Sequence, residues 1–203
     1  MSLWAVVPVK PFRQGKSRLA SVLSEDERYM LNSTLFGNTL RSLTSAKGIE
    51  QILVVSRDTS VLSMAREFGA RTIQEEGPSN LNNALELATG FAVMSGAQQI
   101  LIMPTDLPLL NVLVVEEFIS KGGKLRQMVI SPDRKQDGTN ALMVSPADAI
   151  EYEYGPNSFG KHLAQASKKD LQIEVYPSKV LELDLDFPED LDILRQMEIK
   201  GLE

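Results

Sequence analysis

Short apolar runs alternate along the chain with longer segments in which apolar residues recur every three or four positions. The first run, 3–9, lacks polar alternation, which is typical of a strand buried on both faces. Further strands are expected at 51–56, 70–74, 100–103, 128–131, 140–144, 173–176 and 180–183, and helices at 24–46, 58–68, 85–94, 112–120, 159–166 and from 188 onward. This alternation predicts a three-layer α/β sandwich with a mostly parallel central sheet, plus a small β-rich subregion after Ser131.

The strand expected at 100–103 ends at a proline-bounded acidic segment. Pro104 and Pro108 cannot donate hydrogen bonds to a sheet, so the strand must stop between them. Asp106 is thereby placed at the carboxyl end of a central strand, the edge at which open α/β sheets bind ligands. We expect Asp106 to bind a magnesium ion beneath a nucleoside triphosphate.

Composition narrows the range of functions. The chain has 203 residues, of which 43% are hydrophobic, enough for one domain over 1–203. It has no cysteine and only His162, so thiolate and histidine-rich metal sites are excluded and a hard cation such as Mg²⁺ is left. A net charge of −6 disfavours non-specific nucleic-acid binding. No apolar run approaches the ~20 residues that span a membrane, and no signal peptide is recognised, so we expect a cytoplasmic protein.

A cationic loop follows the first strand and is a candidate triphosphate site. Its four cations within nine residues are Lys10, Arg13, Lys16 and Arg18. Arginine binds phosphate oxygens in pairs and lysine acts as a point charge, although a solvated turn is the simpler alternative. Gly15-Lys16-Ser17 resembles the end of a P-loop, but Lys10 stands where the first P-loop glycine belongs.

A second acidic segment, Asp184-Leu-Asp186, lies far along the chain. Carboxylates from two distant strand ends commonly hold Mg²⁺ between phosphates, so Asp106 with Asp184 or Asp186 is a candidate metal site. The alternative is that these aspartates only cap the final helix, which has Pro188 in its first turn.

Two polar loops are candidates for binding a small anion. Gly138-Thr139-Asn140 offers a flexible backbone, a hydroxyl and an amide, although a hairpin turn explains it equally well. Gly155–Ser158 precedes a helix whose first amides can bind an anion, or it merely caps that helix. His162 lies within this helix, where a structural role is the simpler interpretation.

The base of a nucleotide needs contacts of its own. The polar loop 77–83 opens a helix, and the side-chain amides of Asn80 and Asn83 are candidates for contacting the base, although polar loops of this kind are common without any ligand. Val9 and Lys10 at the end of the first strand, with Thr105 beside Asp106, complete the expected nucleotide-binding set.

Five motifs, in order, resemble the 2-phospho-L-lactate guanylyltransferases of coenzyme F420 biosynthesis. They are Val7–Phe12 with Gly15–Ala20, Pro104–Leu110, Ser131–Leu142, Tyr154–His162 and Leu183–Leu191. The resemblance implies a nucleotide-diphospho-sugar transferase (GT-A) like fold. Two departures are Thr105, where an alanine is common, and Phe187, where the wider superfamily usually has threonine.

The resemblance also implies roles for individual residues. Asp106 and Asp186 would bind Mg²⁺, with Asp184 the less favoured second ligand. The phosphorylated acid would contact Thr139, Gly155 and Ser158, and the triphosphate would be neutralised by Lys16, Arg13 and Arg18. The implied reaction joins GMP from GTP to 2-phospho-L-lactate and releases pyrophosphate. The acid's phosphate is already an anion, so no general base is required.

Several alternatives stay open at this point. Related enzymes use phosphoenolpyruvate or 3-phosphoglycerate, and other GT-A-like nucleotidyltransferases act on sugar phosphates or molybdopterin. A nucleotide-binding module without turnover belongs to a different functional class. Residue types alone do not separate GTP from ATP or CTP, and they leave a homodimer open.

Overall fold

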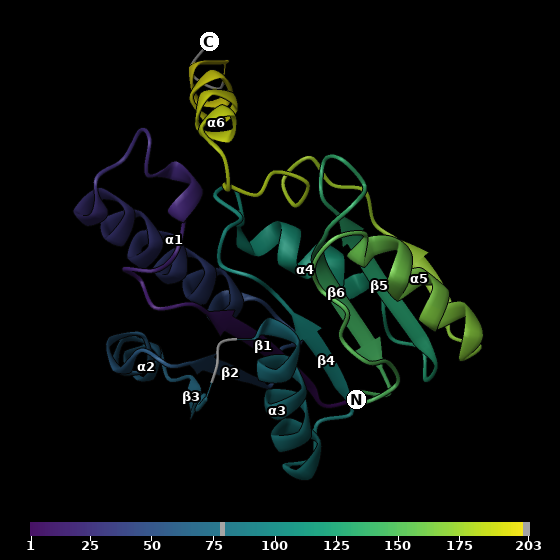
Figure 1. Cartoon of the computed structure of the whole chain (residues 1–203). Helices are drawn as coiled ribbons and strands as arrows, with labels where there is room; N and C mark the ends of the chain where they lie inside the picture. The colour runs from purple at the N-terminus through teal and green to yellow at the C-terminus, as the bar shows by residue number, and fades with distance from the viewer. Residues whose placement is uncertain (78–79, 201–203) are drawn as a thin grey trace.

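A computed structural model describes residues 1–77 and 80–200 of the chain, with side chains up to residue 196 (Figure 1). Its strands are β1 (Leu3–Val9), β2 (Gln51–Ser56), β3 (Arg71–Gln74), β4 (Gln99–Ile102), β5 (Gln127–Pro132), β6 (Thr139–Ser145) and β7 (Gln172–Val175). Its helices are α1 (Glu25–Ser45), α2 (Thr59–Glu67), α3 (Leu81–Met94), α4 (Val112–Ser120), α5 (Ser158–Lys168) and α6 (Pro188–Lys200), with a short 3-10 helix, η1 (Ser17–Leu19).

The strands form one seven-stranded sheet in the order β3-β2-β1-β4-β6-β5-β7. Strands β3, β2, β1 and β4 run parallel to one another, whereas β6 is antiparallel to both of its neighbours, β4 and β5. The β-rich stretch expected after Ser131 therefore extends the main sheet. The predicted mostly parallel sheet is confirmed.

Helices cover both faces of the sheet, as the three-layer prediction requires. One face packs against α1, α2 and α4 through a core that includes Phe36, Val61 and Phe118. The other face packs against α3 and α5 through Leu85 and Ala166. Alternate residues of β1 contribute to the two cores, so this strand is buried on both sides, as its unbroken apolar run predicts.

Helix starts follow local capping chemistry. Ser24 and Glu27 form a reciprocal capping box at α1, and Asp58 caps α2. Helix α3 begins at Leu81, a full turn before the expected residue 85, because Asn80 accepts hydrogen bonds from the backbone amides of Asn82 and Asn83. None of the helices in the described residues is long and apolar enough to cross a membrane.

The prediction of a strand at 180–183 is wrong. This stretch forms turns and coil, and β7 pairs in parallel with β5 instead. Leu181 and Leu183 are nevertheless buried, and the carbonyl of Leu181 accepts a hydrogen bond from Asn140 Nδ2 at 2.8 Å. The alternating apolar pattern therefore reflects burial of the leucines beside the start of β6, not pairing within the sheet.

Candidate functional site

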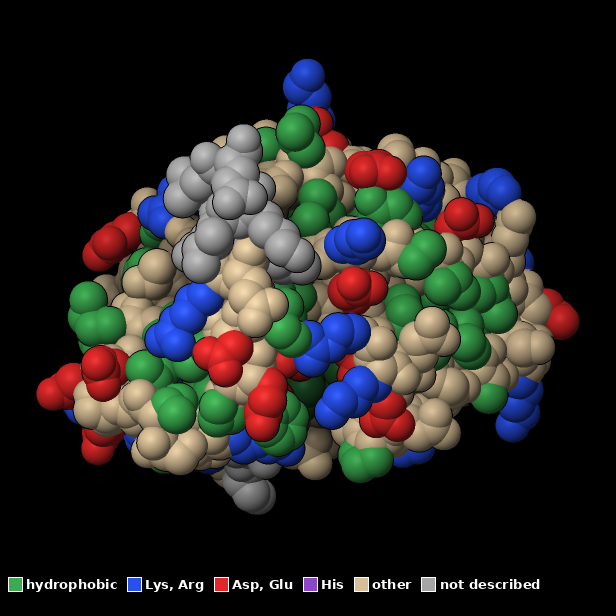
Figure 2. Space-filling model, turned by 90° about the horizontal axis from the view of Figure 1, so that it is seen from above, with side chains coloured by type: hydrophobic (Ala, Val, Ile, Leu, Met, Phe, Trp, Pro, Cys, Tyr) green, Lys and Arg blue, Asp and Glu red, His purple; other side chains and the backbone are tan. Residues whose placement is uncertain are grey.

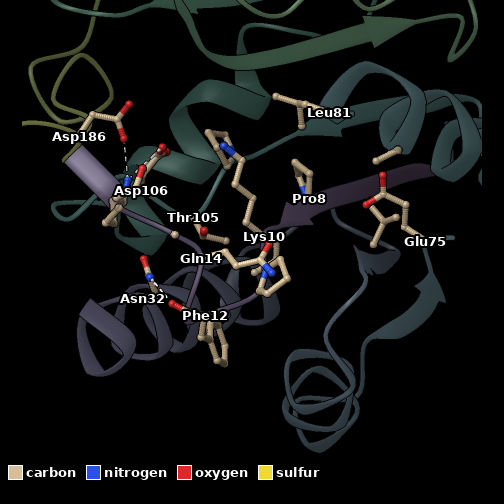
Figure 3. A pocket seen from close by; sticks show the side chains of 18 of the residues that line it. Pro8, Lys10, Phe12, Gln14, Asn32, Glu75, Leu81, Thr105, Asp106 and Asp186 are labelled. Carbon is tan, nitrogen blue, oxygen red and sulfur yellow. Dashed lines mark hydrogen bonds and ion pairs between the residues drawn. The ribbon is translucent and has the colours of Figure 1, made fainter. Parts of the chain in front are cut away.

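A cavity of about 480 Å³ opens at the carboxyl ends of the parallel strands (Figure 3). It lies where β1 has β2 on one side and β4 on the other, the position at which doubly wound sheets bind ligands. Its volume suits a nucleotide-sized ligand. Predicted site residues that line it are Val9, Lys10, Lys16, Arg18, Asn80, Thr105, Asp106, Gly155 and Asp186.

The cationic loop is anchored at its base by one aromatic residue. Phe12 is buried and packs edge-on against Tyr29, and its carbonyl accepts a hydrogen bond from Asn32 Nδ2 at 2.7 Å. A Cβ on Gly15 would stand 2.6 Å from the same Asn32 nitrogen, so any larger residue there would displace the Asn32 side chain. Asn32 is a positioning residue that the sequence motifs did not indicate.

The loop is not a P-loop. The backbone amides of Gln14 and Gly15 both donate to the carbonyl of Pro11, so they do not converge on a phosphate. Lys16 has a left-handed backbone, with φ of 55°, and begins the three-residue 3-10 helix η1, not a long helix. The loop instead presents side-chain charge to the cavity.

Lys16 joins the two aspartates that the sequence places 80 residues apart. Its Nζ lies 3.0 Å from Asp186 Oδ1 and 3.3 Å from Asp106 Oδ2, and its side chain is only 8% exposed. Arg18 adds a contact of 3.1 Å to the other oxygen of Asp186. The two proposed metal ligands therefore face one point, and a cationic side chain stands between them.

Protonation follows from this arrangement. Burial acts to lower the pKa of Lys16, but the charges of Asp106 and Asp186 outweigh it, and the net shift is upward. Burial acts to raise the pKa of Asp186, yet Lys16 and Arg18 more than offset it, and the net shift is downward. Both groups are therefore charged near neutral pH.

Asp184 lies beside the pair without joining it. It contacts Asn140 Nδ2 at 3.4 Å, and burial together with the charge of Asp106 raises its pKa. The amide of Leu185 donates to the carbonyl of Asp106 at 2.9 Å, which ties the acidic segment to the end of β4. The amide of Asp186 is held by Asp190, so the position of this segment is fixed from both sides.

The carboxylates fit a hard cation. Asp106 and Asp186 supply oxygen donors on both sides of one point, and the ammonium of Lys16 already shows that a positive charge is accommodated there. No group of three or more acidic or histidine side chains that could hold a metal ion occurs within residues 1–77 and 80–196. Any Mg²⁺ would therefore need further oxygen ligands from phosphates or water.

Arg13 points elsewhere in this structure. It is 60% exposed, pairs with Glu25 at 2.9 Å and Asp26 at 3.3 Å, and stacks over Tyr29. It does not belong to the cavity lining. The sequence could not separate Arg13 from Lys16, because their orientation depends on the turn at Pro11.

The loop after β3 supplies a different wall of the cavity. Asn80 lines it, but its Oδ1 is occupied in capping α3, whereas Asn83 is exposed and outside the lining. Pro78 and Ser79, within the predicted base-contacting loop, lie outside the described residues. Glu75 also lines this wall, and the motifs gave no signal for it.

Two of the three predicted acid-binding residues, Thr139 and Ser158, form a buried hydrogen-bonded group with His162. Thr139 Oγ1 lies 3.0 Å from His162 Nδ1 and 3.3 Å from Ser158 Oγ. The amide of Glu153 donates to His162 Nε2, so the neutral ring carries its proton on Nδ1 and donates it to Thr139. Burial lowers the pKa of His162 to about 4, consistent with a structural, uncharged histidine.

Of the three predicted acid-binding residues, only Gly155 lines the cavity. Thr139 and Ser158 are buried, with 6% and 1% exposure, and neither lines the cavity. Gly155 has φ of 121°, a backbone conformation that favours glycine. The side-chain amide of Asn82 donates to the carbonyl of Tyr154 and accepts from its backbone N–H, which holds this loop against the first turn of α3.

Solved structures support the fold. A protein from Desulfovibrio desulfuricans described as a nucleotide-diphospho-sugar transferase has a TM-score of 0.77 at 17% identity, covering 97% of this chain and 88% of the other. A nucleotidyl transferase from Methanothermobacter thermautotrophicus has a TM-score of 0.69 at 14% identity, covering 98% and 99%. At these identities the likeness shows the nucleotide-diphospho-sugar transferase fold.

Sequence relatives and a family model give a more specific assignment. Phosphoenolpyruvate guanylyltransferase of Rubrobacter xylanophilus is 40% identical over 94% of this chain and 92% of that protein. 2-Phospho-L-lactate guanylyltransferase of M. thermautotrophicus is 33% identical over 94% and 83%. The family model "Guanylyl transferase CofC like" matches residues 3–198. The chain is therefore a nucleotidyltransferase and belongs to the CofC-like guanylyl transferase family.

Proposed function

We propose that this enzyme transfers GMP from GTP to the phosphate of 2-phospho-L-lactate, in a Mg²⁺-dependent reaction of coenzyme F420 biosynthesis. The observation that carries the proposal is the convergence of Lys16, Asp106 and Asp186 at one end of the cavity. Lys16 would bind the phosphates of an incoming nucleotide. Asp106 and Asp186, released by Lys16, would then bind the metal ion that accompanies those phosphates. Membership of a guanylyl transferase family supports the nucleotide.

The phosphates would bind at the cationic end. Lys16 would leave the carboxylates to neutralise the triphosphate, together with Arg18 and Lys10, which also line the cavity. Asp106 and Asp186 would hold Mg²⁺, which when bound supplies charge neutralisation between phosphates. Arg13 could contribute only after releasing Glu25 and Asp26.

Chemistry would follow from alignment of two anions. An oxygen of the acid's phosphate attacks the α-phosphorus of GTP and forms the new phosphoanhydride bond. The bond from the α-phosphorus to the bridging oxygen breaks, and pyrophosphate leaves with that electron pair. Because the attacking oxygen is already deprotonated, no side chain must accept a proton, and His162 stays out of the reaction.

The acid would bind beside Gly155. The open backbone at Gly155 provides the accessible surface, and the group formed by Thr139, Ser158 and His162 supports it from behind. Direct contact of the acid with Thr139 or Ser158 would require the loop around Gly155 to move, because both hydroxyls are buried.

Phosphoenolpyruvate is a second candidate acid. It is favoured by the 40% identity to the R. xylanophilus enzyme, against 33% to the M. thermautotrophicus one. The two acids differ at the carbon next to the carboxylate, which is planar in phosphoenolpyruvate and tetrahedral in phospholactate. A homodimer and a cytoplasmic location stay predictions, and sedimentation of the purified chain measures the first.

Pyrophosphate release tests the proposal. The purified protein is incubated with GTP and Mg²⁺, and 2-phospho-L-lactate, phosphoenolpyruvate or 3-phosphoglycerate is added separately. The proposal expects release that depends on the acid and is fastest with 2-phospho-L-lactate. Faster release with phosphoenolpyruvate would assign the second candidate, and no release with any acid would contradict guanylyl transfer to a phosphorylated acid.

A further inference from the structure

The cavity has an acidic end that the proposed chemistry does not use. Glu75 follows β3 and lines the cavity, and in Figure 3 it lies on the side opposite Asp106 and Asp186, with Pro8 and Lys10 between them. Glu75 as a whole is half-buried. A carboxylate repels a triphosphate, so an acid in this cavity needs an explanation other than phosphate binding.

The strand order places Glu75 at a distance that suits the base of the nucleotide. Glu75 follows β3 and Asp106 follows β4, and the order β3-β2-β1-β4 separates them by three strand spacings. At roughly 4.8 Å per spacing this is about 14 Å along the edge of the sheet. A nucleoside triphosphate with its phosphates at Lys16 would therefore extend its base toward Glu75.

The surroundings of Glu75 suit a flat, largely apolar ring. Pro8, Leu81 and Ala84 also line the cavity, and Leu81 is 40% exposed although it is apolar. Asn80 lines the cavity next to them, with Oδ1 committed to capping α3. Mostly apolar walls with few polar groups are typical of a site that binds one ring in one orientation.

We propose that Glu75 selects guanine by accepting hydrogen bonds from its N1–H and 2-amino groups. This inference rests on the proposed function, since it requires GTP as the nucleotide. Guanine presents these two donors side by side, and a carboxylate presents two acceptors in matching geometry. Adenine presents a ring-nitrogen acceptor at the same edge, which the carboxylate repels.

The local geometry leaves the carboxylate available for this role. Glu75 Oε1 contacts the backbone amide of Asn80 at 3.4 Å, a long hydrogen bond that orients the side chain without satisfying a carboxylate. The amide of Glu75 donates to the carbonyl of Ser56 at 2.9 Å, which fixes its backbone to the end of β2. Glu75 is thus held at the edge of the sheet, and within residues 1–77 and 80–196 its carboxylate accepts only this one long hydrogen bond.

Glu75→Gln is the diagnostic variant, and Glu76→Gln is its matched control. Glutamine keeps an oxygen for the Asn80 amide but loses the charge and one acceptor, and Glu76 is exposed and outside the cavity lining. Dissociation constants are measured by calorimetry with Mg²⁺ and GTP, ITP, ATP or xanthosine triphosphate. ITP lacks the 2-amino group, and xanthosine triphosphate has a carbonyl acceptor in its place.

We expect the wild type and E76Q to bind GTP at least about tenfold more tightly than ITP. ITP lacks the 2-amino donor, and about tenfold is the effect of losing one hydrogen bond to a charged group. E75Q should lose most of that preference and gain affinity for xanthosine triphosphate, whose carbonyl can accept from the glutamine amide. The gain shows that a loss on GTP does not reflect misfolding.

Two results would overturn the assignment. One is a wild type that binds GTP and ITP equally, and the other is an E75Q protein that keeps the wild-type preference for GTP over ITP. Neither would contradict guanylyl transfer, because acid-dependent pyrophosphate release from GTP is scored separately. A protein that releases no pyrophosphate from GTP with any acid would instead contradict the proposed function.

Discussion

Lys16 shows how one side chain can serve two partners. In this structure its ammonium occupies the point between Asp106 and Asp186, at 3.3 and 3.0 Å, where the proposed Mg²⁺ would be expected. A metal ion and Lys16 cannot both be held there without repulsion. Triphosphate and metal should therefore bind together, because phosphate oxygens give Lys16 an alternative partner.

The variant Lys16→Met tests this competition. Without the ammonium, the two carboxylates lack their shared cation, so Mn²⁺ affinity in the absence of nucleotide should rise several-fold, as measured by electron paramagnetic resonance. In the same protein kcat/KM for GTP should fall about a hundredfold, since the triphosphate loses its buried cation. Lys168→Met, at an exposed position on α5, is the control. Mn²⁺ affinity that is unchanged or lower would contradict the competition.

His162 has a different energetic role. Its folded-state pKa of about 4 lies below the ordinary 6.5, so the unfolded chain binds a proton that the folded chain excludes. The contribution of His162 to the free energy of unfolding is therefore fully present above pH 6.5. It is lost as pH falls toward 4, and the loss is at most about 3 kcal/mol.

Unfolding at pH 8 and pH 5 checks this with His162→Asn. The variant should be less stable at pH 8, by roughly 1–3 kcal/mol, because the partners of the ring lose hydrogen bonds. Its loss of stability between pH 8 and pH 5 should be smaller than that of the wild type, because the titrating ring is absent. Equal pH dependence in the two proteins would show that His162 is not excluded from protonation.

At the scale of elements, the loop between β1 and α1 depends on one glycine. An alanine at position 15 would displace Asn32, whose side chain holds the carbonyl of Phe12, so the loop that carries Lys16 would shift. We expect Gly15→Ala to raise KM for GTP about tenfold, because the displaced loop no longer aligns Lys16 with the phosphates. The melting temperature should change little, because the loop lies outside the sheet.

Gly90→Ala provides the matched comparison. Gly90 lies in the middle of α3, and a Cβ there would meet nothing within 4 Å. Alanine should stabilise the protein by about 0.5–1 kcal/mol and leave KM unchanged, since it favours the helix without touching the cavity. If both variants changed KM alike, the special role of Gly15 would be refuted.

Elements with strong local signals were predictable from the sequence. The unbroken apolar run of β1 and the capping residues Ser24 and Asp58 define elements that the structure reproduces. The structure of 180–183 was not predictable, because its alternating leucines are buried by tertiary contacts beside the start of β6. The early start of α3 depended on whether Asn80 would cap it.

At the scale of the whole molecule, long-range topology assembles the cavity. The sequence places Asp106 and the cationic loop at strand ends, and parallel strands bring such ends to one edge. It could not show that Arg13 turns toward α1 or that Thr139 and Ser158 lie behind the surface. The role we assign to Glu75 depends on β3 lying three positions from β4, an order that no local pattern encodes.

Charge distribution at this scale agrees with a site for anions. The chain carries a net charge of −6, yet cations gather where the parallel strands end. Figure 2 shows basic and acidic side chains close together in the middle of the face seen from above. Among Lys10, Lys16 and Arg18, only Lys16 has a buried side chain, and its ion pairs with Asp106 and Asp186 hold its ammonium in place. In the proposed mechanism the triphosphate would take over from these carboxylates.

Acid-dependent pyrophosphate release by Asp106→Asn measures the central claim most directly. Wild type with GTP, Mg²⁺ and 2-phospho-L-lactate should form pyrophosphate and a guanosine diphosphate ester in equal amounts. The variant should be slower by about a hundredfold or more while its melting temperature stays near that of the wild type. Full Mg²⁺-dependent turnover by Asp106→Asn would contradict the claim that the end of β4 supplies the metal anchor of this transferase.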